Sequence, residues 1–323
     1  MPGVLTHFQE DALRLELPGV RGLLGSRASQ LESDRMRNHP DVPASVKGPS
    51  RVQPQWPPGR IVELDLKPDH GEESYCGAGR MEGRVALVTE GDSGLGRAVA
   101  IAFAREGAHV AISYTRNRNG AEETAHWVGQ AGRQAMLSEG DVADPEYRVK
   151  LLQRVRRQLR RLDVLVNNSA FEWVTELDEQ TQAAELEAVF RTRNESVFFL
   201  SELAADLMEA RGSIILTTAV QGEMSQAQGR AHAANGGAVG NIAASLARRF
   251  APRGIRVSAV ATGPVWTPRV LAALSTEEIR SFGASTCLGR PAQPAEVAPT
   301  YVWLASAESG PKSGEVLRVT LVE

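Results

Sequence analysis

The sequence predicts a doubly wound α/β domain, in which helices cover both faces of a parallel sheet, behind a proline-rich N-terminal extension. Two observations predict it. Short apolar runs alternate with longer amphipathic segments from residue 83 onward, and this spacing is typical of parallel strands joined by helices. A glycine-rich turn separates the first apolar run from the first amphipathic segment. We therefore assign residues 1–80 to an extended arm and residues 81–323 to one α/β domain.

The arm lacks the alternation seen later in the chain. Only residues 11–24 carry a weak helical pattern of apolar side chains, and proline recurs throughout. Each proline fixes φ and removes a backbone donor, so a packed helix or strand is not expected. An inert extension and an arm that docks on a neighbouring subunit both remain open. Among the prolines are Pro40, Pro43, Pro49, Pro54, Pro57, Pro58 and Pro68.

The elements of the domain follow from the positions of the apolar runs. The expected strands span residues 84–89, 110–114, 134–138, 163–167, 213–218, 257–261 and 316–320. The expected helices span residues 94–107, 121–130, 145–162, 181–210 and 233–250. Buried parallel strands are apolar along their whole length, as these runs are. In such sheets ligands bind beyond the carboxyl ends of the strands, where the strand order reverses.

Composition excludes several classes of function. A formal net charge of −3 gives no reason to expect nucleic acid or an anionic membrane as a partner. The basic stretch 154–161 fits a solvated helix face. The chain has no apolar run long enough to span a membrane, no basic and apolar leader, and no Cys/His cluster for a metal. We expect a cytoplasmic protein without a metal site.

The glycine-rich turn is the first candidate binding site. Glycines let a backbone approach a pyrophosphate closely, and the helix that follows presents its positive N-terminus. The turn lies between an expected strand and an expected helix, which is the context that such a site requires. We predict phosphate contacts from Thr89, Gly91, Ser93, Gly94, Leu95, Gly96 and Arg97.

These residues and three later motifs resemble the short-chain dehydrogenase/reductase family. The motifs are Asp141-Val142, the stretch Asn167-Asn168-Ser169-Ala170, and the segment Thr262-Gly263-Pro264 followed by Thr267. The resemblance covers about residues 60–323 and implies a Rossmann-type fold. It also implies that Asp141 and Val142 contact adenine, and that Asn167, Gly263, Pro264 and Thr267 border the cofactor. The lead-in at residues 68–75 is similar to the arm of a bacterial subgroup of sugar- or polyol-type oxidoreductases.

Arginines favour NADP over NAD as the cofactor. The second expected strand ends without an acidic residue for a ribose hydroxyl, and Arg116 follows it. A guanidinium suits a 2′-phosphate, and Arg97 is a second candidate for that contact. Glu90 opposes binding, because it replaces a family glycine beside the pyrophosphate. Like charges at about 4 Å cost on the order of 4 kcal/mol near a protein surface, so retained and lost cofactor binding are both open.

The family's catalytic side chains are replaced. Members of the family use a tyrosine, a lysine four residues later, a serine about thirteen residues earlier, and an asparagine on the preceding helix. The matching positions here are His232, Gly236, Ala219 and Arg193. Alanine cannot donate to an alkoxide and glycine carries no charge, so efficient hydride transfer by the family's route is not expected. Gly236, Gly237 and Gly240 also weaken the expected helix by about 1 kcal/mol each relative to alanine.

Three functions follow. The first is a family member without hydride transfer, which acts as a binding or regulatory protein or as the subunit partner of an active homologue. The second is a non-redox enzyme that uses His232 as acid or base, with Arg193 supplying positive charge. The third is a slow NADP-dependent carbonyl reductase or alcohol dehydrogenase. The resemblance also implies a homo-oligomer, a tetramer or dimer, built on the helices near residues 194–210 and 233–250, with a small-molecule ligand.

Overall fold

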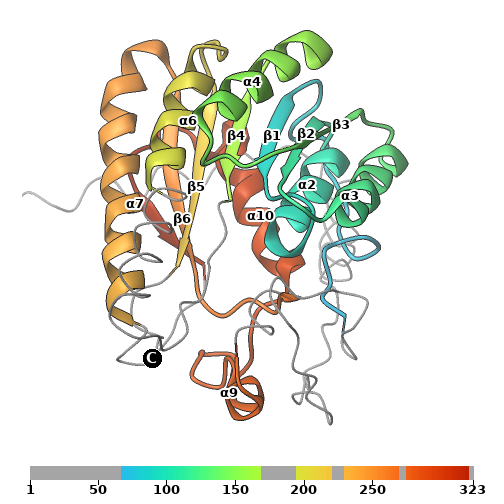
Figure 1. Cartoon of the computed structure of the whole chain (residues 1–323), viewed down its shortest axis with the longest axis vertical. Helices are drawn as coiled ribbons and strands as arrows, with labels where there is room; N and C mark the ends of the chain where they lie inside the picture. Colours follow the sequence, from blue (N-terminus) through green and yellow to red (C-terminus); the bar gives the residue numbers. More distant parts are fainter. Residues whose placement is uncertain (1–66, 169–193, 220–228, 269–273, 320–323) are drawn as a thin grey trace, which may run out of the picture. The chain divides into compact units, whose positions relative to one another are not determined.

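A seven-stranded sheet of parallel strands, in the order β3-β2-β1-β4-β5-β6-β7, forms the centre of the domain (Figure 1). The structure is a computed structural model, and it describes residues 67–168, 194–219, 229–268 and 274–319. The strands are β1 (Val85–Thr89), β2 (His109–Tyr114), β3 (Ala135–Glu139), β4 (Val164–Asn167), β5 (Ser213–Ala219), β6 (Arg256–Thr262) and β7 (Val316–Arg318). The predicted doubly wound fold is confirmed.

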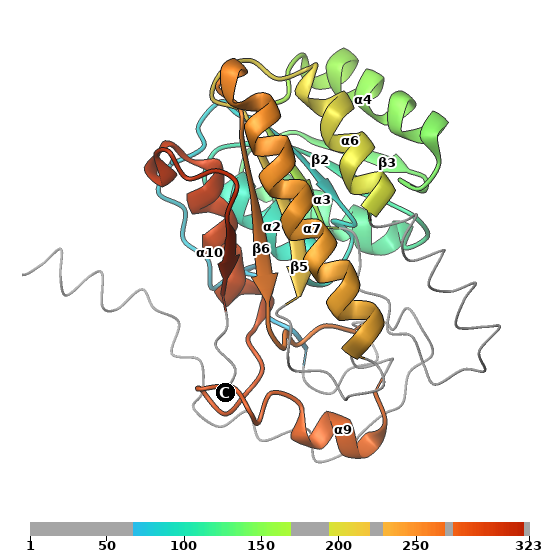
Figure 2. The ribbon, with the colours of Figure 1, turned by 90° about the vertical axis from the view of Figure 1, so that its left-hand side faces the viewer.

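Helices cover both faces of this sheet (Figures 1 and 2). Helices α2 (Gly94–Arg105), α3 (Arg118–Gln130) and α10 (Pro294–Ala305) share one face, and α4 (Pro145–Leu159), α6 (Ser196–Ala205) and α7 (Gly229–Phe250) share the other. The short helix α9 (Thr276–Ser281) lies beyond the carboxyl ends of β5 and β6. The strand order reverses between β1 and β4, so the carboxyl ends of these two strands mark the expected ligand site.

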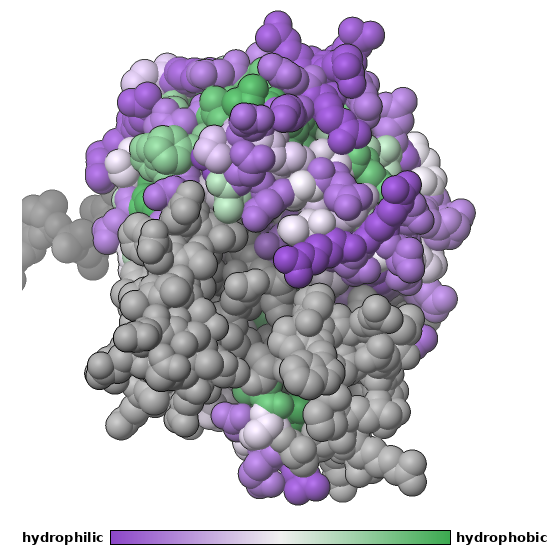
Figure 3. Space-filling model, in the orientation of Figure 1, coloured by the Kyte–Doolittle hydropathy of each residue, from purple (hydrophilic) through white to green (hydrophobic). Residues whose placement is uncertain are grey.

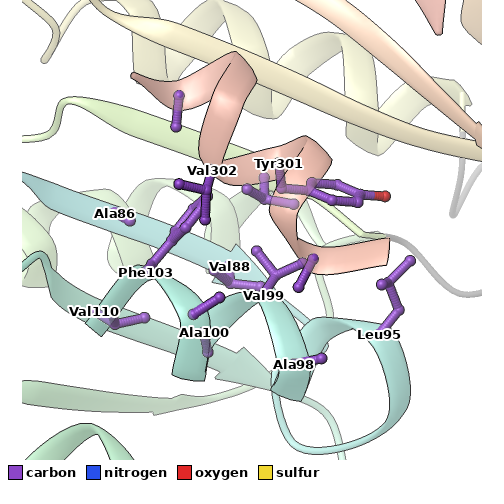
Figure 4. Close-up of a cluster of buried hydrophobic side chains, with 14 of the residues drawn as sticks. Ala86, Val88, Leu95, Ala98, Val99, Ala100, Phe103, Val110, Tyr301 and Val302 are labelled. Atoms are coloured by element: carbon purple, nitrogen blue, oxygen red, sulfur yellow. The ribbon is translucent and has the colours of Figure 1, made fainter. Parts of the chain in front are cut away.

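Apolar packing on the first face holds α2 and α10 against the sheet (Figure 4). The side chains of Phe103 and Val99 on α2 meet Tyr301 and Val302 on α10, above Val88 of β1. Phe103, Tyr301 and Val302 are fully buried. Burying a large apolar side chain contributes roughly 1.5–3 kcal/mol, so this contact fixes the helix whose first turn follows the glycine-rich loop.

Several expected boundaries are corrected. The helix expected at 145–162 ends at Leu159, because Arg160 adopts a left-handed conformation with φ 72° and stops it. The strand expected at 316–320 is described as Val316–Arg318. Of the helix expected at 181–210, the described part is Ser196–Ala205, and residues 169–193 lie outside the described ranges. Helices α9 and α10 were not expected.

Residues 67–81 are bonded to the domain at several points, and one of them is a buried carboxylate. Glu106, fully buried at the end of α2, accepts hydrogen bonds from the Tyr75 hydroxyl at 2.6 Å and from the Arg80 guanidinium at 2.6 Å. Its other oxygen accepts the backbone N–H groups of Ala78 and Arg80 at 2.9 and 3.0 Å. This end of the predicted arm is therefore bonded to the domain, while residues 1–66 lie outside the described ranges. The boundary at residue 80 stays a prediction.

Within the described ranges, no helix combines the length and apolar character needed to cross a lipid bilayer.

Candidate functional site

The glycine-rich loop runs from β1 into α2 as predicted. Gly94 has φ +51°, and a Cβ on it would lie 3.2 Å from the Thr267 methyl carbon. A Cβ on Gly96 would lie 2.2 Å from the backbone oxygen of Glu90, so that position admits only glycine. Ser93, which precedes α2, makes no capping hydrogen bond with its side chain. The first amides of α2 are thus not capped by that hydroxyl, which leaves them suited to an anion.

Glu90 has an unusual backbone for its side chain. It is half-buried and has φ 50°, in the left-handed region that favours glycine. The family motif has a glycine at this position, and the backbone angle is one that glycine adopts readily. The loop therefore keeps a backbone conformation typical of glycine at this position, although the residue there is a glutamate.

Polar side chains join the loop to the end of β4. The Thr89 hydroxyl accepts the backbone N–H of Asn168 at 2.9 Å. The buried Asn167 amide donates to the Ser201 hydroxyl at 3.0 Å. A Cβ on Gly96 would also lie 2.7 Å from the Asn168 side-chain nitrogen. Thr89 thus links the carboxyl ends of β1 and β4, and Asn167 links β4 to α6. Direct contact of either residue with a cofactor stays a prediction.

Arg97 lies inside the protein rather than at the loop surface. Its side chain is 1% exposed and forms an ion pair of 2.9 Å with Glu123. Its guanidinium also donates to the backbone oxygens of Asp92 and Gly120 at 3.0 and 3.1 Å, and to the Thr124 hydroxyl at 3.2 Å. All of these partners belong to the loop or to α3. The predicted contact of Arg97 with a 2′-phosphate therefore has no support from its placement.

Arg116 is placed differently. It follows β2 by two residues and is exposed. Within the described part of the chain its guanidinium has no hydrogen-bond or ion-pair partner, whereas Arg118 pairs with Glu122 at 2.9 Å. That pairing raises the pKa of Arg118. Of the predicted arginines, Arg116 therefore has the guanidinium available to a ligand.

The predicted adenine segment is held by residues of α4. The Tyr147 ring packs on Gly140, where a Cβ would lie 2.2 Å from the ring. The Tyr147 hydroxyl is hydrogen-bonded to the Ser113 hydroxyl at 3.0 Å and donates to the backbone oxygen of Ser138 at 2.8 Å. Arg148, buried, donates to the Val142 oxygen at 2.7 Å. Burial raises the pKa of Tyr147 and lowers that of Arg148.

The segment after β6 completes the opposite side of the site. Gly263, Pro264 and Thr267 are half-buried. The N–H of Trp266 donates to the Ala292 oxygen, and the Ala292 N–H donates to the Pro264 oxygen, both at 2.9 Å. This small parallel bridge fixes the segment so that Thr267 lies against Gly94. The structure thus brings the two predicted cofactor segments together.

The predicted catalytic positions are described in part. Ala219 is the last residue of β5, is half-buried, and is paired in register with Thr262 of β6. It therefore stands at the carboxyl edge of the sheet, and its methyl group offers no hydrogen-bond donor. His232 and Gly236 belong to the first turns of α7, whose side chains over residues 229–236 are not described. Arg193 lies outside the described ranges.

Sequence reasoning missed the residues that support the site from inside. Tyr147 and Arg148 act through partners that are distant in the sequence or through backbone oxygens, and no local motif marks them. Buried hydrogen-bonding side chains of this kind are visible only once the fold has placed both partners. No cluster of metal-ligating side chains occurs within the ranges that the structure describes.

Comparisons with known proteins agree on one family. A family model described as enoyl-(acyl carrier protein) reductase matches residues 90–320. General stress protein 39 of Bacillus subtilis is 37% identical over 285 residues, which cover 88% of this chain and 97% of that protein. Glucose and ribitol dehydrogenase homolog 2 of Arabidopsis thaliana is 38% identical over 254 residues, covering 77% and 88%. A short chain dehydrogenase from Burkholderia cenocepacia, solved in complex with NADP, superposes with a TM-score of 0.69 at 28% identity, covering 74% of this chain and 97% of that one.

Proposed function

This chain belongs to the short-chain dehydrogenase/reductase family, and we propose that it binds NADP(H) but lacks the family's carbonyl–alcohol hydride transfer. The observation that carries this proposal is Ala219. The register of β5 against β6 puts it at the carboxyl edge of the sheet, and the family resemblance of the sequence aligns it with the family's serine. The sequence adds His232 and Gly236 at the positions of the tyrosine and lysine.

The backbone of the loop supports cofactor binding. Gly94 is in a left-handed conformation, Gly96 leaves no room for a Cβ, and the first amides of α2 are not capped by Ser93. Arg116 has an exposed guanidinium for a 2′-phosphate. A short chain dehydrogenase with which the chain superposes was solved in complex with NADP. Bound nicotinamide would supply a hydride, and the residues present would hold its phosphates and ribose.

The protonation step is where the site fails. Reducing a carbonyl requires a proton for the developing alkoxide and donors to stabilise its charge. A general acid typically contributes roughly 10²–10⁴ in rate, and an oxyanion donor a similar factor. The Ala219 methyl supplies neither, and Gly236 supplies no charge to lower a pKa. The chain would then act as a nucleotide-responsive binding protein, for example as a subunit partner of an active homologue or as a homo-oligomer.

The surface over α4 and α6 is where such a partner would bind. In the view of Figure 3 the described surface is mainly hydrophilic, with apolar residues gathered over these helices. Val149 on α4 and Phe199 on α6 are 43% and 46% exposed. The tetramer or dimer that the family resemblance implies would use α6 and α7, and α6 is common to both surfaces.

The test is to restore the missing groups. Ala219→Ser, His232→Tyr and Gly236→Lys, combined in one variant, are expected to raise NADPH-dependent reduction of aldehydes at least a hundredfold above the wild type. Fluorescence titration with NADPH would show whether wild type and variant bind the cofactor equally. Micromolar binding without a gain in the variant would place the defect elsewhere in the pocket. Steady NADPH turnover by the wild type, at a rate that Ala219→Ser does not raise, would contradict the proposal.

The other two functions remain alternatives. The His232 side chain lies outside what the structure describes, so proton transfer or elimination at that residue stays a prediction. His232→Ala separates them, because it abolishes acid–base chemistry that depends on the imidazole. A slow reductase with another proton donor would instead keep its NADPH turnover in that variant.

A further inference from the structure

Arg97 is a buried cation whose contacts join two parts of the nucleotide site. One of its terminal nitrogens donates to the backbone oxygen of Asp92 in the glycine-rich loop at 3.0 Å and to that of Gly120 in α3 at 3.1 Å. The same nitrogen lies 2.9 Å from the Glu123 carboxylate. Thr124 accepts from Arg97 Nε at 3.2 Å and donates onward to the Gly120 oxygen at 3.0 Å. Loop and helix therefore share one guanidinium.

A second set of contacts reinforces the same junction. The Asn117 side-chain oxygen accepts the Gly120 N–H at 3.1 Å and so caps α3. Its nitrogen donates to the Asp92 carboxylate at 3.2 Å. A Cβ on Gly120 would lie 2.6 Å from the Asp92 backbone oxygen, so the loop and α3 touch without a side chain between them. The segment from β2 to α3, which carries Arg116, is thus bonded at its far end to the phosphate loop.

We propose that Arg97 is a positioning residue for selection of the 2′-phosphate. It holds Asp92 and Gly120 at a fixed separation, and it thereby sets the distance between the pyrophosphate loop and Arg116. Its side chain is 1% exposed, and its Nε and one terminal nitrogen are bonded to the loop and to α3, so it acts through these contacts rather than by touching the nucleotide. The inference rests on the proposed NADP(H) binding and extends it to the source of the cofactor preference.

Charge and geometry predict how substitutions behave. Arg97→Met keeps the apolar stem but leaves the Asp92 and Gly120 oxygens without their buried donor. Arg97→Lys keeps the charge, yet one ammonium cannot reproduce the planar fork that reaches Thr124 and both oxygens. Glu123 is 55% exposed, so Glu123→Gln removes only a solvent-screened ion pair. Arg118→Met is the matched control, since it removes an exposed arginine from α3, the helix that Arg97 contacts.

The experiment compares nucleotide preference with local exchange. We measure dissociation constants for two pairs of ligands, NADPH with NADH, and adenosine 2′,5′-bisphosphate with 5′-AMP. The temperature is one at which circular dichroism shows every variant to be folded. We expect Arg97→Met to lower the preference for the 2′-phosphorylated member of each pair at least tenfold, toward the value of Arg116→Met. Arg97→Lys should recover part of this preference, and Glu123→Gln and Arg118→Met should leave it within about threefold. The tenfold change expected of Arg97→Met corresponds to about 1.4 kcal/mol.

Hydrogen exchange supplies a readout that needs no nucleotide. In Arg97→Met the amides of residues 91–93 and 117–121 should exchange faster together, while Arg118→Met leaves residues 91–93 unchanged. An Arg97→Met variant that weakens NADPH and NADH by the same factor overturns the inference. If the wild type binds neither nucleotide, the proposed function fails. The positioning role then stands only if the two segments loosen together, and it is wrong if one loosens alone.

Discussion

Glu90 shows how one residue can alter a site whose backbone is intact. The left-handed conformation at φ 50° costs a non-glycine residue roughly 1 kcal/mol or more. The loop nevertheless keeps the shape that Gly94 and Gly96 require. Glu90 in place of the family's glycine therefore adds backbone strain and a negative charge beside the place where a pyrophosphate would bind.

Two substitutions at this position separate strain from charge. Glu90→Gln removes the charge and keeps the strain, and we expect NADPH affinity to rise about tenfold or more, because like charges at about 4 Å cost on the order of 4 kcal/mol. Glu90→Gly removes both and should also raise or preserve the melting temperature. Titration of NADPH against each variant checks this. Equal affinity in wild type and Glu90→Gln would mean that the carboxylate is directed away from the phosphates.

Glu106 is a second residue whose effect can be predicted, in this case on stability. Burial alone would raise the pKa of its carboxyl, but the hydrogen bonds from Arg80, then from Tyr75, and from the backbone amides of Arg80 and Ala78 lower it from 4.5 to about 2. The folded pKa is thus depressed. The stabilisation from Glu106 is present above about pH 4.5 and is lost as the pH falls toward 2.

Glu106→Gln should therefore cost about 3 kcal/mol of unfolding free energy at pH 7, because it breaks a buried charged cluster. The cost should shrink as the pH falls from 4.5 toward 2, since the wild-type carboxyl then becomes neutral. Urea unfolding of both proteins at several pH values measures it. Glu82→Gln is the control, because Glu82 is 64% exposed in its pair with Arg133. A difference that does not change with pH would refute the assignment.

At the scale of elements, helix α10 explains why sequence reading was incomplete. Pro294 at its first position is a start signal, and Glu296 accepts the backbone N–H of Gln293 at 2.7 Å. Pro299 lies inside the helix, and proline there argues against a helix in a sequence-based reading. The packing of Tyr301 and Val302 on α2 outweighs that local cost. Periodicity alone does not reveal such tertiary compensation.

Helix α7 gives a similar lesson about glycine. The sequence offers no reason for glycines in its expected range, yet a Cβ on Gly240 would lie 3.2 Å from a methyl carbon of Val316 in β7. The small residue allows the helix to approach the edge strand closely. The reason is non-local, because Gly240 and Val316 are far apart in the chain.

Tyr147 of α4 offers a test at this scale. Tyr147→Phe removes the hydrogen bonds to Ser113 and Ser138 and should destabilise the fold by about 1–3 kcal/mol. It should also weaken 5′-AMP binding several-fold, because the hydroxyl no longer ties α4 to the Ser138 oxygen in β3, the strand that leads into Asp141-Val142. Thermal unfolding and calorimetric titration check both effects. Stability lost with no change in 5′-AMP affinity would separate Tyr147 from the nucleotide site.

For the whole molecule, the strands follow from sequence because buried parallel strands are continuous apolar runs, whereas their order in the sheet is set by non-local pairing and was not predicted. The phosphate loop was also predictable, since glycine spacing between a strand and a helix is a local signal. The partners of Arg97 were not predictable, because Glu123 and Thr124 lie on another helix. The proposed loss of hydride transfer rests on substitutions that the sequence shows, and the pairing of Ala219 with Thr262 supplies the position of Ala219 at the sheet edge.

The central claim is that the chain binds NADP(H) without transferring its hydride, and deuteride transfer from labelled NADPH tests it most directly. The wild-type protein is saturated with NADPH deuterated at both C4 positions and incubated with a panel of aldehydes and ketones. The product alcohols are then analysed by mass spectrometry. We predict saturable NADPH binding and no deuterated alcohol above a protein-free blank. Deuterated alcohol formed in catalytic amounts by the wild type, and lost when the NADPH site is blocked by adenosine 2′,5′-bisphosphate, would contradict the claim.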